Sequence, residues 1–155
     1  MLKNAISLIV ALLLCLSVCG CTDNSKKPNN GGQLGEDKMY ITINDNKLDV
    51  ALADNSAVAA LMDILEQGDI VYTADDYGGF EKVGALGHTL PSNDSRITTT
   101  AGDVILYSSN QIVLFYGSNT WSYTRLGRIE GYSASELATL LGAGKGALQV
   151  TISLQ

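Results

Sequence analysis

Cysteine is missing from most of the chain. The sequence has 155 residues and three cysteines, Cys15, Cys19 and Cys21, all within its first 21 positions. Residues 22–155 therefore offer no disulfide, no thiolate nucleophile and no cysteine ligand for a metal ion. Any chemistry in this part of the chain must come from other side chains.

Histidine and positive charge are also scarce. His88 is the single histidine, which excludes a multi-histidine zinc site, and we expect it to lie in a surface loop. Sixteen acidic residues against ten basic ones give a net charge of −6, which argues against binding to nucleic acid or to anionic lipid. Asp75 and Asp76 lack the alternating acidic pattern of a calcium loop. We therefore predict no metal, no cofactor and no nucleic-acid partner.

Long apolar runs occur only at the start of the chain. Residues 1–20 carry one charge, Lys3, followed by an apolar stretch from Ala5 to Leu16 and then by small residues. This order is typical of an export signal, and the stretch is shorter than the roughly 20 residues that a bilayer span needs. Removing residues 1–20 takes away one lysine and no acid, which leaves the remainder at −7. Any membrane attachment must therefore come from something other than basic residues.

The end of this signal contains Val18, Cys19, Gly20 and Cys21. These residues resemble the lipobox of bacterial lipoproteins, which implies lipidation of Cys21 by fatty acyl chains such as palmitate. The alternative is an ordinary secretory signal that happens to contain cysteines. Residues 22–37, TDNSKKPNNGGQLGED, have little to bury, so we predict a flexible linker over residues 21–37. The predicted location is the cell envelope, with the exported domain anchored to a membrane by lipid.

Residues 38–155 are rich in short segments of strand character. Segments with alternating or apolar side chains, bounded by turn residues, predict eight strands over residues 39–43, 47–52, 69–73, 96–100, 103–107, 111–116, 123–129 and 148–154. Residues 75–87 have little periodicity, so we expect a glycine-rich loop there, opened by two solvated carboxylates. The lone tryptophan, Trp121, is also expected in a loop.

Two segments have helical spacing instead. A first helix is predicted to start at Asp54 or Ser56 and to run through Gln67, where Gly68 stops it. A second helix begins with a capping box formed by Ser133 and Glu136. Many short antiparallel strands favour a barrel or a sandwich, and a helix near each end of the domain can close the two mouths of a barrel. We predict a mostly β domain, a closed antiparallel β-barrel of about eight strands with two capping α-helices.

The order of motifs resembles that of cyclophilins. Gln111 opens an apolar strand, Trp121 follows, and residues 127–131, GRIEG, precede a helix. Residues 76–82, 102–107 and 114–117 are similar to stretches of the small bacterial cyclophilin-like family, and the resemblance covers nearly all of residues 39–154. It implies a cyclophilin-like barrel in which Gln111 and Trp121 border a groove. The alternative is that Gln111 ends a turn and Trp121 packs on the barrel rim.

The resemblance does not extend to isomerase chemistry. Cyclophilins carry a catalytic arginine in the first half of the barrel, but residues 78–90 contain none. Arginines occur only at positions 96, 125 and 128. Fold alone does not establish function.

Aromatic side chains gather in two glycine-containing regions, as expected of a binding surface. The candidates for a ligand groove are Tyr77, Phe80, Gln111, Phe115, Trp121 and Arg125. The favoured hypothesis is a module that binds a peptide or small ligand without strong catalysis. The alternative is a peptidyl-prolyl cis-trans isomerase acting on exported proteins, with Arg125 or Arg96 replacing the missing arginine. A third hypothesis is a structural envelope component that binds nothing.

Overall fold

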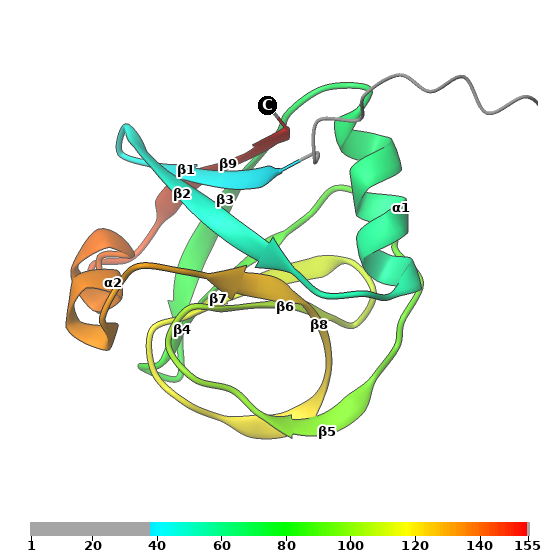
Figure 1. Ribbon diagram of the computed structural model, residues 1–155. Helices are drawn as coiled ribbons and strands as arrows, with labels where there is room; N and C mark the ends of the chain where they lie inside the picture. Colours follow the sequence, from blue (N-terminus) through cyan, green and yellow to red (C-terminus); the bar gives the residue numbers. More distant parts are fainter. Residues whose placement is uncertain (1–37, 155) are drawn as a thin grey trace, which may run out of the picture. The chain divides into compact units, whose positions relative to one another are not determined.

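The computed structural model describes residues 38–154, so the predicted signal, Cys21 and the linker lie outside the described residues. Two helices and nine strands make up this part of the chain (Figure 1). In chain order they are β1 (Met39–Ile43), β2 (Asn46–Leu52), α1 (Ser56–Leu65), β3 (Ile70–Tyr77), β4 (Glu81–Ala85), β5 (Ser95–Thr98), β6 (Asp103–Tyr107), β7 (Gln111–Phe115), β8 (Thr120–Ile129), α2 (Ala134–Leu140) and β9 (Leu148–Leu154).

Eight of the strands form a closed antiparallel barrel. Their order is β2-β1-β9-β3-β4-β7-β6-β8, and pairing of β2 with β8 closes the ring. The ninth strand, β5, pairs only with the first part of β8, where Ser95 lies opposite Tyr123 and Thr98 opposite Thr120. Figure 1 shows β5 and this part of β8 as an arm below the barrel. The predicted fold class is therefore confirmed, with one additional strand outside the ring.

The main core fills the barrel, and both helices contribute to it. Figure 1 shows α1 and α2 on opposite sides of the barrel. From α1, the residues Ala57, Val58, Leu61 and Leu65 are buried in the same cluster as Leu137 of α2 and Leu141 just after it. Each helix therefore covers the barrel with a single apolar stripe, as its helical spacing predicts.

The two helix starts differ in how well the sequence predicts them. The capping box of α2 is confirmed, since Ser133 Oγ accepts from the Glu136 backbone N–H at 3.3 Å and Glu136 Oε2 accepts from the Ser133 N–H at 2.7 Å. The start of α1 was predicted one residue off. Asn55 is the cap, and its side chain accepts from the Val58 N–H at 3.1 Å while its Nδ2 donates to the Arg125 backbone oxygen at 2.8 Å. That second contact, to a distant strand, selects it over neighbours of equal local suitability.

The prediction of a loop over residues 75–87 is wrong. Strand β3 continues to Tyr77, a tight turn at Gly78 and Gly79 has positive φ, and β4 then runs back along β3. The sequence hides β4 because its first two residues, Glu81 and Lys82, are charged yet buried. Burial of charge goes against the usual pattern by which strands are found.

The prediction that Trp121 lies in a loop is also wrong. It is in β8, where it pairs with Ile97 of β5. A polar surrounding sequence concealed this strand because both strands of the arm are largely exposed. Strand β8 is therefore longer than predicted. Its first part pairs with β5, and its second part pairs with β6 and β2.

Strand β7 is buried on both faces. Its Ile112 and Leu114 point into the barrel core, whereas Val113 and Phe115 belong to a second, smaller cluster with Ile105 and Tyr123. Successive side chains of a strand point to opposite faces, so this second cluster covers the outside of the barrel sheet. We call it the outer cluster. Its position explains the unbroken apolar run of β7 and provides the floor of the candidate site.

Candidate ligand-binding pocket

A cavity of about 360 Å³ lies against the outer cluster. Pockets for small ligands typically range from about 300 to 1,000 Å³, so this one suits a small ligand or a single side chain. Aromatic rings and a few polar groups surround it, from Tyr77, Glu81, Val83, Tyr107, Gln111, Val113, Asn119, Trp121 and Tyr123.

The barrel sheet supplies one wall of this cavity and the arm supplies the other. On the sheet, Val83 of β4 lies opposite Val113 of β7, and Gln111 of β7 lies opposite Tyr107 of β6. These side chains share the outer face because they alternate with residues of the barrel core. On the arm, Tyr123 of β8 meets the Tyr107 ring edge-on, with the ring centroids 6.0 Å apart.

Three of the six residues proposed from sequence line the cavity. They are Tyr77, Gln111 and Trp121, and the first and last of these are well exposed, at 67% and 54%. Phe115 is fully buried beneath the cavity, where it stacks on Phe80 with ring centroids 6.2 Å apart. Phe80 and Phe115 therefore support the floor rather than line it.

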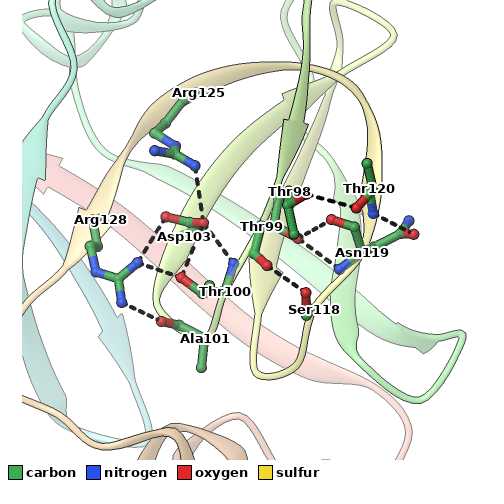
Figure 2. A network of polar contacts seen from close by, with 10 residues as sticks. All are labelled: Thr98, Thr99, Thr100, Ala101, Asp103, Ser118, Asn119, Thr120, Arg125 and Arg128. Carbon is green, nitrogen blue, oxygen red and sulfur yellow. Dashed lines mark hydrogen bonds and ion pairs between the residues drawn. The ribbon is translucent and has the colours of Figure 1, made fainter.

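Arg125, the sixth residue, is engaged elsewhere. Its Nη2 lies 3.2 Å from Asp103 Oδ2, and Arg128 Nη1 lies 3.1 Å from Asp103 Oδ1 (Figure 2). The carboxylate is buried and also accepts from the Thr100 N–H at 2.8 Å. This network fixes β8 to the start of β6, and none of the arginines at positions 96, 125 and 128 is among the residues that line the cavity.

Polar contacts hold the open end of the arm. Figure 2 shows Ser118 donating to the Thr99 backbone oxygen, at 2.7 Å, and the Thr98 and Thr120 hydroxyls 2.8 Å apart. Asn119 Nδ2 donates to the Tyr123 hydroxyl at 2.9 Å, which orients both of these cavity-lining side chains. The arm is thus positioned by hydrogen bonds as well as by the outer cluster.

Glu81 is a cavity residue that sequence reasoning missed. Its side chain is only 5% exposed, and Oε2 is buried without a hydrogen-bond partner within residues 38–154. Burial raises the pKa of this carboxyl from its usual 4.5 to about 7, because the charged form loses hydration without gaining a partner. The sequence conceals Glu81 because β4 resembles a loop, whereas in the strand Glu81 shares a face with Val83.

The adjacent Lys82 points to the other face of β4 and is fully paired. Its Nζ lies 2.8 Å from Asp76 Oδ2, and it also donates to the Gly146 backbone oxygen. Asp76 further accepts from the Tyr116 hydroxyl at 2.9 Å and from the Gly146 N–H at 3.0 Å. The Lys82 ammonium, and to a smaller extent the Tyr116 and Gly146 donors, hold the pKa of Asp76 well below its usual range. We call this network the Lys82 clamp. Asp76 therefore does not open a solvated loop, contrary to the prediction.

Two further observations bear on the kind of site. Within the described residues no group of three or more His, Cys, Asp or Glu side chains is arranged to hold a metal ion. His88 is exposed, as expected for a surface position. Separately, none of the helices in residues 38–154 has the length and apolar character needed to cross a bilayer.

Comparison with known proteins establishes the family. The model of a family described as "Cyclophilin-like family" matches residues 41–153, almost the whole described domain. The chain belongs to this cyclophilin-like family. No functionally curated protein matches it.

A solved structure supports the same fold. The solution structure of a hypothetical protein from Archaeoglobus fulgidus is similar to this cyclophilin-like domain with a TM-score of 0.55. The two chains share 18% identity, and the match covers 77% of this chain and 98% of the archaeal one. At this identity the likeness concerns the fold alone. The function of the cyclophilin-like domain must therefore be argued from its own pocket.

Proposed function

We propose that this cyclophilin-like domain is a ligand-binding module that holds a peptide or a small ligand in the pocket between the barrel sheet and the arm. The observation that carries the proposal is the cavity of about 360 Å³ itself, with aromatic rings on its walls and the doubly buried strand β7 as its floor. Sites of this composition, concave and mostly apolar with a few polar groups, are typical of small-ligand binding. Rigid support of the floor limits the entropy lost on binding.

Trp121 provides the test, because it is the single tryptophan of the chain and lines the cavity. We expect pools of short peptides, and separately a collection of small metabolites, to contain members that change its fluorescence saturably. The full-length protein in a nonionic detergent is the sample. Val83→Phe should fill the cavity and remove the response, while Val71→Phe, at an exposed position of β3, should leave it unchanged. Silence toward every peptide and metabolite would favour the structural envelope component instead.

The isomerase alternative is tested by the same protein preparation. A prolyl isomerase needs a guanidinium aimed at the proline amide, yet no arginine is among the cavity-lining residues. Arg125 is held by Asp103 at 3.2 Å. We therefore expect isomerisation of proline peptides at the uncatalysed rate. A large acceleration that Arg125→Ala abolishes would establish the enzyme and remove the binding-only proposal.

The location of the module is part of the same proposal. Residues 1–20 have the features of an export signal, and Cys21 stands where lipoproteins are acylated. Several acyl chains give the stable anchoring that one chain cannot. Cys21→Ala should shift the protein from the membrane fraction to the soluble fraction. Equal membrane fractions of the two proteins would contradict the lipid anchor.

A further inference from the structure

The pocket combines aromatic rings with one buried, unpaired carboxyl group. Tyr77, Tyr107, Trp121 and Tyr123 line it, and Glu81 is its single carboxylic acid. Glu81 Oε2 is buried and accepts no hydrogen bond from any residue of the described domain. Buried polar atoms are almost always satisfied, so an unsatisfied acceptor on a side chain that lines a cavity indicates a missing donor.

Residues 38–154 do not supply a counter-charge. Three ion pairs are present in residues 38–154, and Glu81 takes part in none of them. Lys82, its neighbour in sequence, is committed to Asp76 on the other face of β4. An entering cation can therefore provide what Glu81 lacks, and the negative faces of aromatic rings attract the same kind of group.

We propose that the pocket binds the alkylammonium group of its ligand, with Glu81 as the counter-ion and the surrounding aromatic rings as the walls. This inference rests on the proposed binding function and specifies its ligand class. A primary ammonium is favoured over a quaternary one because only the former has N–H groups to donate to Glu81. The same chemistry is offered by a free amine and by a lysine side chain of a peptide.

The contribution of Glu81 to binding must be distinguished from those of the other ionisable groups around it. The phenols of Tyr77 from β3, Tyr107 from β6 and Tyr123 from β8 share the cavity. Tyr116, just after β7, interacts electrostatically with Glu81. Burial and the hydrogen bond to Asp76 raise the pKa of Tyr116 to about 12. Beyond them lies the Lys82 clamp. The change of Glu81 alone to glutamine isolates its contribution from all of these.

The test titrates Trp121 fluorescence in the full-length protein with three probes of similar size and one lysine peptide. They are n-butylammonium, n-butanol, butyrate and a Gly-Lys-Gly peptide with blocked ends. At pH 8 we expect n-butylammonium to bind at least about tenfold more tightly than n-butanol, and Glu81→Gln to remove this advantage. Glu66→Gln, at an exposed position after α1, is the matched control and should change nothing. If the peptide binds more tightly than n-butylammonium, the natural source of the ammonium group is a lysine side chain. If the peptide binds more weakly, the source is a free amine.

The dependence on pH is a second, independent measurement that needs no variant. With a Glu81 pKa of about 7, proton binding competes with the cation, so affinity should fall by about tenfold from pH 8 to pH 6. Equal affinity for n-butanol and n-butylammonium, or an affinity that does not fall toward pH 6, would overturn the ammonium inference and leave the binding proposal standing. Failure of all probes, peptides and metabolites would overturn both.

Discussion

The stability of the empty protein should reveal the unpaired state of Glu81. The perturbation is Glu81→Gln, which keeps the size of the side chain and removes its charge. The pKa of Glu81 rises from 4.5 in the unfolded chain to about 7 in the folded one, and each pKa unit corresponds to about 1.4 kcal/mol. Ionisation of Glu81 therefore destabilises the fold by about 3 kcal/mol in full, of which about 2.5 kcal/mol falls between pH 5 and pH 8.

The sign follows from where the proton resides. Between pH 4.5 and pH 7 the folded protein keeps the Glu81 proton that the unfolded chain releases, so its free energy of unfolding falls as the pH rises. Asp76 acts in the opposite direction. Its lowered pKa gives stability that is present above the unfolded value near 4 and is lost only as acid protonates the folded state. The two effects place the optimum of stability in mildly acidic solution.

Urea unfolding followed by circular dichroism measures both proteins at pH 5 and pH 8. We expect the free energy of unfolding of Glu81→Gln, minus that of the natural protein, to increase by about 2.5 kcal/mol from pH 5 to pH 8. Glu66→Gln should show no such change, because Glu66 is exposed in the folded protein. A difference between the natural protein and Glu81→Gln that stays constant from pH 5 to pH 8 would refute the reasoning, and the ammonium site would lose its basis with it.

Three further changes test the frame around the pocket. Lys82→Met leaves Asp76 without its cation, and we expect urea unfolding to show a loss of about 1–3 kcal/mol, because Asp76 is partly exposed and keeps two other donors; a loss below about 0.5 kcal/mol would contradict the clamp. Gly84→Ala should lower the melting temperature strongly, since an added Cβ would lie 2.4 Å from the Thr73 backbone oxygen, and overpacking of this kind costs about 1–3 kcal/mol. Asn55→Ala should cost about 1–2 kcal/mol in the same assay; an unchanged midpoint would mean that another residue caps α1.

Much of the barrel could be predicted because its strands follow simple rules. Strands such as β2 and β9 alternate between buried and more exposed residues and are bounded by turn residues, which is the pattern that sequence analysis detects. Strand β7 was found for a different reason. Its unbroken apolar run is typical of a strand that is buried on both faces.

The site was harder to predict because its strands break those rules. Glu81 and Lys82 are charged residues in buried positions, so β4 has the composition of a loop. Nothing in the local sequence shows that Lys82 will meet Asp76, or that Glu81 Oε2 will find no partner within the described domain. Both facts depend on how β3, β4 and β7 are arranged in three dimensions, and the same is true of the contact that ties Arg125 to Asp103.

The two charged residues at the start of β4 differ in a way that the fold alone does not require. Lys82 is fully buried, and its ammonium group donates to Asp76 Oδ2 and to the Gly146 backbone oxygen. Glu81, one position earlier, is 5% exposed, lines the cavity and leaves its Oε2 without a partner in residues 38–154. A buried charge without a partner lowers stability, and an apolar residue would serve the outer cluster better. A ligand that supplies the missing partner would offset this cost, which points to function at Glu81 rather than at the better-connected Lys82.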